Sequence, residues 1–175
     1  MPDKSLFTKE PGSSRLFLRL FLRLCCGMIW NIQRETGGVT MPDYFNLNMP
    51  RNELMNVSSL GLAHLGDAVF EVLVRSWVCM GGTAKIKELH KQTVRFVSAP
   101  AQAAMAEKIL PVLSEEETDV FRRGRNAAPH SIAKSATRSQ YQTATALESL
   151  FGWLWLQGRT QRINELFAAM MEGEE

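Results

Sequence analysis

The sequence predicts an all-α protein, and three observations support that prediction. Beyond residue 50, apolar residues recur at steps of three and four, which is the spacing of one helix face. No segment alternates apolar and polar residues as a half-buried strand would. Capping residues and Gly or Pro bound the periodic segments. We expect helices at about residues 59–80, 83–94, 99–110, 114–125, 141–157 and 159–171.

Length and composition indicate one ordinary globular domain with an extension. The chain has 175 residues, of which 45% are apolar and 22% charged. The formal charge of +2 is uneven, because residues 1–40 carry six Lys or Arg and three Asp or Glu, whereas residues 41–175 carry 14 and 15. Any nucleic-acid surface of the domain is therefore a local patch. Three cysteines without CxxC spacing suit a reducing cytosol, and scattered histidines without an HExxH pair argue against zinc.

Residues 1–40 differ from the rest, and we expect an N-terminal extension followed by a single domain at 41–175. The apolar run at 16–24 is interrupted by Arg19 and Arg23 and is shorter than the roughly 20 residues that span a bilayer. No clean signal-peptide cleavage site follows it. An interfacial amphipathic helix is one interpretation. We favour a disordered extension, or upstream sequence translated from a start codon assigned too early.

Local signals justify the ends of the predicted helices. Asn56 or Ser58-Ser59 can cap the first helix, Thr83 is the candidate N-cap of the second, and Ser98 caps the third. Ser114-Glu115-Glu116-Glu117 opens the fourth helix with a capping box and acids in its first turn. These glutamates are therefore expected to stabilise a helix start rather than to form a metal cluster.

The helix at residues 59–80 contains the first candidate for chemistry, Asp67. One apolar stripe contains Leu60, Leu65, Val69, Leu73 and Trp77. A second stripe, at four-residue steps, contains Ala63, Asp67, Glu71 and Arg75. Glu71 has Arg75 as an ordinary i, i+4 partner, but Asp67 has no local cation. Asp67 is either a hydrogen-bonded structural acid or, in our interpretation, the ligand of a divalent metal.

The second candidate is Glu148, in a helix at 141–157 that is apolar nearly all round. Such a helix belongs at the centre of a bundle or in a subunit interface. An isolated buried carboxylate is costly, so Glu148 is a salt-bridge partner, a protonated acid, a residue that reaches solvent, or a metal ligand. Hard oxygen ligands of this kind suit Mg²⁺ or Mn²⁺, which bind phosphate substrates.

Basic residues occur in two groups. The first group lies along the helix predicted at 83–94 and just beyond it, and contains Lys85, Lys87, Lys91 and Arg95. The second group contains Arg122, Arg123, Arg125, Lys134 and Arg138 and extends into residues 126–140, which are too polar and too rich in small residues to pack, so we expect a surface loop. Solvated helix ends explain many of these charges, and contact with a polyanion is the alternative.

Five segments stand out: HLGDAVFE at 64–71, LHK at 89–91, VSAPAQA at 97–103, RRGRNA at 122–127 and YQTATALESLFGWLWL at 141–156. Together they resemble the Mini-ribonuclease III family, the compact ribonuclease III-like enzymes without a double-stranded-RNA-binding domain. The resemblance covers residues 54–171 and leaves out the extension. It implies a homodimeric, cytoplasmic endoribonuclease with a ribonuclease III-type helical domain, which cleaves double-stranded RNA with Mg²⁺ (or Mn²⁺).

The resemblance also implies roles for individual residues. Asp67 matches the catalytic aspartate and Glu148 the metal-binding glutamate. Glu71 is our own candidate for a secondary ligand, which would supply part of a thin ligand set. Ala63 and Thr145 occupy positions where full-length ribonuclease III enzymes have two further acids. The residues expected to contact RNA are Lys91, Arg122, Arg123, Arg125, Asn126, Lys134 and Arg138.

The implied substrate is the precursor of 23S ribosomal RNA, with ribosomal proteins or the pre-ribosome as further partners and no membrane. The residues by themselves are also compatible with two other functions. The first is a catalytically inert ribonuclease III-like module for RNA binding or ribosome assembly, which the missing acids at Ala63 and Thr145 favour. The second is a metal-dependent phosphohydrolase acting on a small nucleotide.

Overall fold

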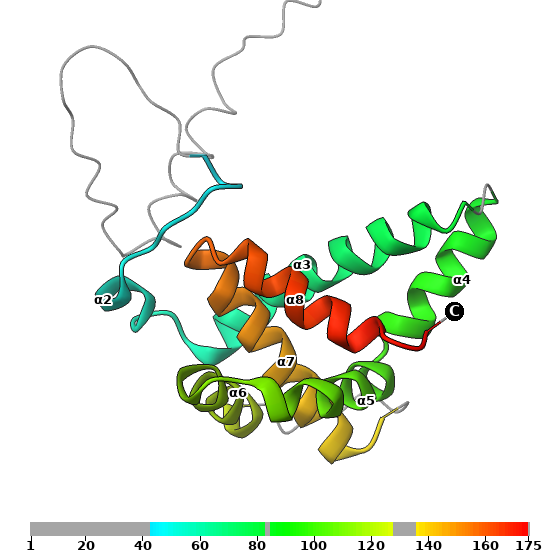
Figure 1. The fold of residues 1–175 in the computed structure, drawn as a ribbon. Coiled ribbons are helices and arrows are strands. Elements are labelled where there is room, and N and C mark those ends of the chain that lie inside the picture. Colours follow the sequence, from blue (N-terminus) through cyan, green and yellow to red (C-terminus); the bar gives the residue numbers. More distant parts are fainter. Residues whose placement is uncertain (1–42, 83–84, 128–135, 175) are drawn as a thin grey trace, which may run out of the picture. The chain divides into compact units, whose positions relative to one another are not determined.

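The computed structural model describes residues 43–82, 85–127 and 136–174 (Figure 1). The contacts of the chain divide it into Met1–Met41 and Pro42–Glu175, and the extension predicted at 1–40 lies outside the described residues. The second unit is all-α, as predicted, with no strand in the ranges described. Its elements are α2 (Arg51–Leu54), α3 (Ser59–Met80), α4 (Ile86–Val97), α5 (Ala99–Ile109), the 3₁₀ helix η1 (Leu110–Val112), α6 (Glu115–Ala127), α7 (Arg138–Leu156) and α8 (Thr160–Met171).

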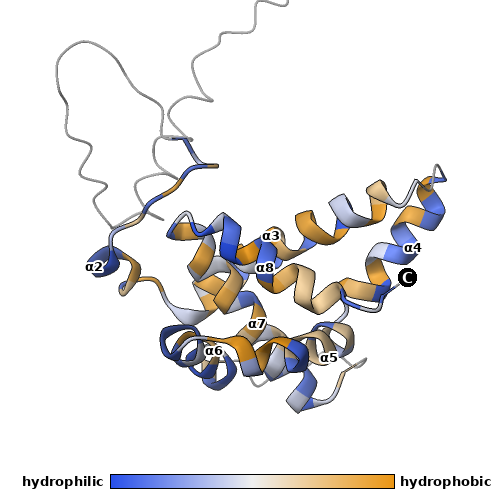
Figure 2. Cartoon of the chain, viewed as in Figure 1, coloured by the Kyte–Doolittle hydropathy of each residue, from blue (hydrophilic) through white to orange (hydrophobic). Residues whose placement is uncertain are grey.

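Helix α7 is the centre of this unit, as its apolar sequence predicts. It packs against α3 on one side and against α5 and α6 on another, while α8 covers α5 and α7 (Figure 1). Leu147, Leu150, Phe151 and Leu154 of α7 are fully buried. In Figure 2 hydrophobic stretches run along α3, α7 and α8, whereas α6 and the outer part of α4 are largely hydrophilic. The helix carrying Glu148 is therefore part of the core.

Glycines allow α3 and α7 to approach backbone to backbone. A Cβ atom on Gly66 would overlap the carbonyl oxygen of Glu148, and one on Gly152 would overlap the carbonyl oxygen of Leu62. Ser149 strengthens the same contact, because its hydroxyl donates to the Ser59 carbonyl oxygen at 3.0 Å. This close packing sets Asp67, the residue after Gly66, beside Glu148.

Several predicted helix ends agree with the structure. Ser58 caps α3 by accepting a hydrogen bond from the Gly61 backbone N–H at 3.0 Å. Ser114 and Glu117 form the predicted capping box at the start of α6. Helix α6 continues to Ala127, so Asn126 is in its last turn rather than in the predicted loop.

Two predicted boundaries are wrong. Helix α4 covers Ile86–Val97 instead of 83–94, because the buried side chains of Thr93 and Phe96 keep the last turn against the core. Thr83, its predicted N-cap, lies outside the described residues. Helix α7 begins at Arg138 rather than at 141, because Thr137 and Gln140 form a capping box. Arg138 is therefore helical.

The apolar stripe predicted on α3 is only partly the side that packs. Val69 is buried, but Leu60 is 44% exposed, and Leu65, Leu73 and Trp77 are half-buried against the core. The most fully buried side contains Leu62, Gly66, Phe70, Val74 and Val78. Because α3 is apolar on more than one side, spacing alone does not say which side faces α7.

Candidate active site

Asp67 and Glu148 meet at the contact between α3 and α7. They line one cavity of about 300 Å³, together with Leu60, Ala63, His64, Tyr141 and Thr145. Asp67 is exposed and Glu148 is half-buried. Two acids that are 81 positions apart in the chain are thus brought to one cavity by the Gly66 contact.

The surroundings of both acids disfavour their charged forms. Burial raises the pKa of Glu148 to about 7; the negative charge of Asp67 adds to this rise, and Gln102 opposes it. Although Asp67 is exposed as a residue, its carboxyl group is partly shielded from water, and this desolvation is the main cause that raises its pKa. The charge of Glu71 raises the pKa further, while His64 lowers it. Neither Asp67 nor Glu148 forms an ion pair with any residue that the structure describes.

This arrangement fits a divalent cation. Two carboxylates that repel each other, and that form no ion pair in the ranges described, provide hard oxygen ligands and a local excess of negative charge. The ligand set is small, since no group of three or more His, Cys, Asp or Glu suited to a metal occurs in the described ranges. A cation here must therefore take its remaining ligands from water or substrate, as Mg²⁺ commonly does.

The positions of the two missing acids offer no replacement ligand. Ala63 is 5% exposed and apolar. Thr145 is 4% exposed, and its hydroxyl donates to the Tyr141 carbonyl oxygen at 3.0 Å within α7. Glu71, the suggested secondary ligand, does not line the cavity. Arg75 donates to Glu71 Oε1 from Nε at 3.0 Å and from Nη2 at 2.6 Å, so this carboxylate already has a cation.

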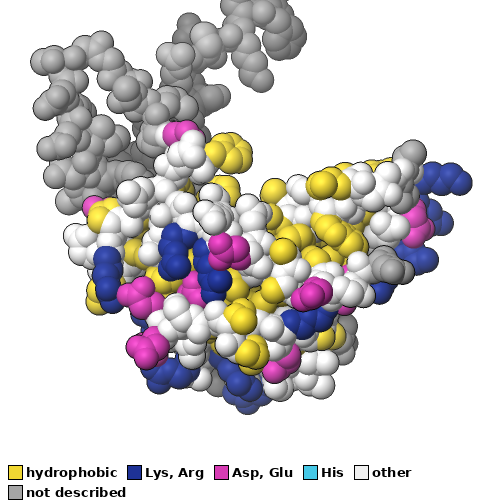
Figure 3. All heavy atoms as spheres, viewed as in Figure 1, with side chains coloured by type: hydrophobic (Ala, Val, Ile, Leu, Met, Phe, Trp, Pro, Cys, Tyr) yellow, Lys and Arg dark blue, Asp and Glu magenta, His cyan; other side chains and the backbone are white. Residues whose placement is uncertain are grey.

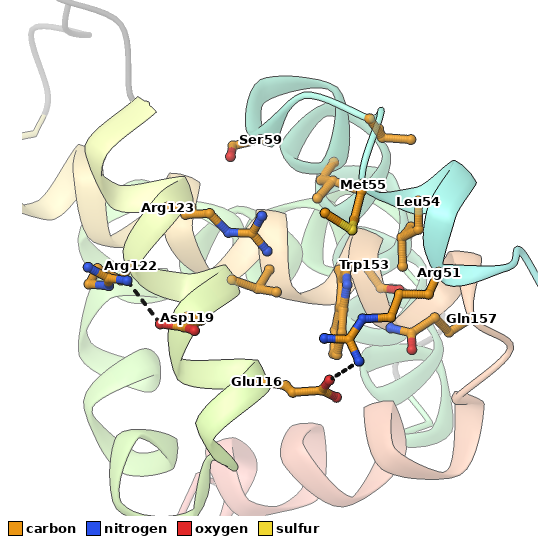
Figure 4. Close-up of a pocket in the computed structure, with 13 residues that line it drawn as sticks. Arg51, Leu54, Met55, Ser59, Glu116, Asp119, Arg122, Arg123, Trp153 and Gln157 are labelled. Carbon is orange, nitrogen blue, oxygen red and sulfur yellow. Dashed lines mark hydrogen bonds and ion pairs between the residues drawn. The ribbon is translucent and has the colours of Figure 1, made fainter.

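Those residues predicted to bind RNA that the structure describes lie outside the cavity of the two acids. Arg122 and Arg123 of α6 line a different cavity, of about 390 Å³, between α2, α3, α6 and α7. Arg122 pairs with Asp119 at 3.0 Å, whereas Arg123 points towards the cavity (Figure 4). Across the same cavity, Arg51 of α2 pairs with Glu116 at 3.1 Å.

The other residues predicted to contact RNA, as far as the structure describes them, are spread over three helices. Arg125 and Asn126 are exposed in the last turn of α6, and Arg138 is exposed in the first turn of α7. Lys91 is exposed on α4, whose Lys and Arg side chains gather at the end of that helix (Figure 3). Lys134 lies outside the described residues.

Gln102 of α5 is a neighbour of the site that the sequence reasoning missed. Its side chain is 1% exposed, and it lowers the pKa of the Glu148 carboxyl group against the effect of burial. A signal was present, because Gln102 occupies the same helical stripe as the buried residues Met105, Ala106 and Ile109. Burying a polar side chain costs free energy, so a glutamine at a core position indicates a role other than packing.

Among the described helices, none is both long enough and apolar enough to cross a membrane.

Comparisons with known proteins place the chain among ribonucleases. A family model described as the Ribonuclease III domain matches residues 60–159, which contain both acids. The chain is 41% identical over 115 residues to Mini-ribonuclease 3 of Symbiobacterium thermophilum, covering 66% of this chain and 88% of the relative. It is 45% identical over 118 residues to Mini-ribonuclease 3 of Brevibacillus brevis, with the same two coverages. A crystal structure of a protein from Fusobacterium nucleatum aligns with a TM-score of 0.65 and 30% identity, over 70% of this chain and 98% of that one.

Proposed function

This chain belongs to the Mini-ribonuclease 3 family and is an endoribonuclease with a Ribonuclease III domain. We propose that it cleaves double-stranded RNA in an active site formed by Asp67 and Glu148. The proposed cofactor is Mg²⁺, with Mn²⁺ as an alternative. The single observation that supports this most is the meeting of the two carboxylates in one cavity, where neither pairs with a cation in the described part of the chain. The catalytic domain is proposed to be residues 41–175.

The residues of the chain perform distinct tasks in this proposal. Asp67 and Glu148 would hold the cation, and both must be deprotonated to do so, which makes metal binding favourable at higher pH. When bound, the cation supplies positive charge that stabilises the negative charge developing on the scissile phosphate. Water attacks phosphorus and the 3′ oxygen leaves as a hydroxyl group, so that the new 5′ end carries the phosphate.

Selection of the substrate follows from shape and charge. Double-stranded RNA is recognised mainly by its A-form geometry and by contacts to phosphates and 2′-hydroxyl groups. Positive side chains on α4, α6 and the start of α7 provide phosphate contacts. They are Lys91, Arg122, Arg123, Arg125 and Arg138, with Asn126 as a polar neighbour and Lys134 in the segment between α6 and α7. The proposed target is precursor 23S ribosomal RNA in the cytoplasm, with the pre-ribosome as a further partner.

We also propose that the enzyme is a homodimer formed through an apolar face, the α3/α8 face. It includes Leu65, Val72 and Leu73 of α3, Trp155 of α7 and Ile163 of α8, which line a cavity of about 370 Å³. Hydrophobic side chains gather on this side of the molecule (Figure 3). A twofold dimer would provide two identical sites, one for each strand of an RNA duplex.

A cleavage assay tests the site directly. Wild type, Asp67→Asn and Glu148→Gln are incubated with structured precursor RNA, with and without Mg²⁺, and the products are separated on a gel. Each substitution keeps the size of the side chain but removes an ionised oxygen ligand, so cleavage should fall by about 100-fold or more.

Two results would contradict the proposal. Cleavage that survives both substitutions would place the reaction elsewhere. RNA binding by the wild type without any cleavage at any Mg²⁺ concentration would support the inert RNA-binding module instead.

A further inference from the structure

The cavity of Asp67 and Glu148 contains hydrogen-bond donors as well as acids. Seven residues line it, and those with a side-chain N–H or O–H group are His64, Tyr141 and Thr145. The Thr145 hydroxyl already donates to the Tyr141 carbonyl oxygen at 3.0 Å. The side chains of His64 and Tyr141 form no hydrogen bond within the described part of the chain. These two residues therefore bring free donors to the cavity.

Helical spacing places each donor on the same side of its helix as one acid. His64 precedes Asp67 by three positions on α3, and Tyr141 precedes Glu148 by seven positions on α7. His64 is exposed and Tyr141 is half-buried, so both can be reached from solvent. The donors thus line the cavity from two different helices, as the acids do.

The arrangement of His64 differs from that of a third metal ligand. His64 lines the same cavity as the two acids, yet no group of three His, Cys, Asp or Glu suited to a metal occurs in the described ranges. Mg²⁺ also prefers oxygen ligands to an imidazole nitrogen. The imidazole is therefore free to contact the substrate instead.

A phosphate that enters the cavity needs such contacts. It meets two carboxylates there and no lysine or arginine. A divalent cation balances the two carboxylate charges, which leaves the negative charge of the phosphate itself. An imidazole has at least one N–H donor in either protonation state, and a tyrosine hydroxyl also donates. Hydrogen bonds from such groups to a charged phosphate oxygen are stronger than those between neutral groups.

We propose that His64 and Tyr141 bind the phosphate at the cleavage position of the RNA strand, His64 through a ring N–H and Tyr141 through its hydroxyl group. The two donors hold that phosphate against Asp67 and Glu148, so the contacts to RNA extend from the basic residues outside the cavity to the reacting group itself. This inference rests on the proposed active site at Asp67 and Glu148.

The test measures RNA affinity in the Glu148→Gln background, where we expect the strand to remain intact, by fluorescence anisotropy of a labelled RNA duplex. His64→Leu and Tyr141→Phe are added to this background one at a time, since each removes the donor and keeps a side chain of similar size. Each should weaken binding by about 10-fold, the effect of losing one hydrogen bond to a charged group. His64→Gln, which retains an N–H donor, should keep most of the affinity.

A modified duplex shows whether the contact is made at the reacting phosphate. The cleavage position is first mapped with wild type, and the phosphate there is replaced by an uncharged methylphosphonate. The two-way comparison of protein and RNA changes isolates the interaction between them. His64→Leu and Tyr141→Phe should weaken binding of this duplex much less than binding of the unmodified one.

Tyr44→Phe is the matched control for Tyr141→Phe. Tyr44 is the only other tyrosine of the chain, is 59% exposed and does not line the cavity, so RNA affinity should stay unchanged. In an otherwise wild-type protein, His64→Leu should leave Mn²⁺ binding unchanged, as measured without RNA by electron paramagnetic resonance of the free ion.

The outcomes separate this inference from the proposed function. A folded His64→Leu or Tyr141→Phe variant with unchanged RNA affinity would overturn the phosphate contact at that residue and leave the metal site intact. Weaker Mn²⁺ binding by His64→Leu would make His64 a metal ligand and would overturn its proposed role. Wild-type cleavage by Asp67→Asn would overturn the active site itself, and the phosphate contacts with it.

Discussion

Glu117 and Glu148 show two ways in which a protein accommodates a buried carboxylate. Glu117 is fully buried, and its oxygens accept hydrogen bonds from Arg162 at 3.0 Å, from Arg159 at 3.3 Å and from the Ser114 backbone N–H at 2.9 Å. Burial raises the pKa of Glu117, but these donors outweigh it and hold the pKa below its usual range. Glu148 has no such cations among the residues that the structure describes, and its pKa rises to about 7. This difference is the one expected if Glu148 is the proposed metal ligand and Glu117 is a structural acid.

The raised pKa of Glu148 predicts how stability depends on pH without metal. The folded protein keeps a proton on this group from pH 4.5, its ordinary pKa, up to about 7, whereas the unfolded chain releases it. The stability that the folded protein gains by holding this proton is fully present below pH 4.5 and is lost as pH rises through 7. Wild type should therefore lose roughly 3 kcal/mol relative to Glu148→Gln over this window.

Urea unfolding in the presence of EDTA at several pH values between 4.5 and 8 measures this difference. The comparison reports on the coupled pair rather than on Glu148 alone, since Asp67 titrates with it. Added Mg²⁺ should restore the stability of wild type at pH 8 but not that of Glu148→Gln. Parallel pH curves for the two proteins would show that the acids do not interact as described.

At the scale of single elements, the sequence predicts helix α3 well and its orientation poorly. The bounds 59–80 follow from Ser58 and Gly81, which are local signals. The side that packs on α7 depends on Gly66 and Gly152, whose importance lies in a contact between distant helices. The start of α7 at Arg138 is an intermediate case, because the Thr137–Gln140 capping box is written in the sequence.

The candidate site was predictable to a similar extent. Asp67 and Glu148 are visible as acids without local cations on apolar helices, and the family resemblance pairs them. Gln102 is harder to recognise, because a lone polar residue on α5 has a meaning only when its neighbour on α7 is known. The loop assignment of Arg138 failed because polar residues at a helix start look like a loop.

The contact of α3 with α7 predicts the effect of Gly66→Ala. The added Cβ would overlap backbone atoms of Glu148, which cannot rotate away as a side chain can, so the helices must separate. We expect a loss of about 1–3 kcal/mol or more in the free energy of unfolding. We also expect cleavage to fall further than the folded fraction does, because the separation moves Asp67 away from Glu148.

Gly61→Ala is the control on the same helix. Gly61 is exposed, and its Cβ would meet only side-chain atoms, with Ser58 Oγ at 3.2 Å. Denaturant unfolding and the cleavage rate are measured for wild type, Gly66→Ala and Gly61→Ala at a temperature where all three are folded. Wild-type cleavage by a folded Gly66→Ala protein would mean that the tight helix contact is not needed for the site.

At the scale of the whole molecule, hydrophobic side chains gather in a patch on the α3/α8 face, with charged groups beside it and at the end of α4 (Figure 3). Val72 is 63% exposed and Phe45 78% exposed at this face. Large apolar side chains that cluster on a surface indicate an interaction site. A second copy of the chain is the partner that would also give the duplex a second active site.

Val72→Lys therefore tests the proposed dimer. A lysine at the centre of a twofold interface meets its own copy, so two charges would be buried close together and association should weaken strongly. Wild type should sediment at twice the 19.7 kDa mass of the chain and the variant at the mass of one chain. Val94→Lys, at a 48% exposed position on α4, should remain dimeric. If the wild type sediments as a monomer while it cleaves both strands of a duplex, the α3/α8 face has another partner and each active site works alone.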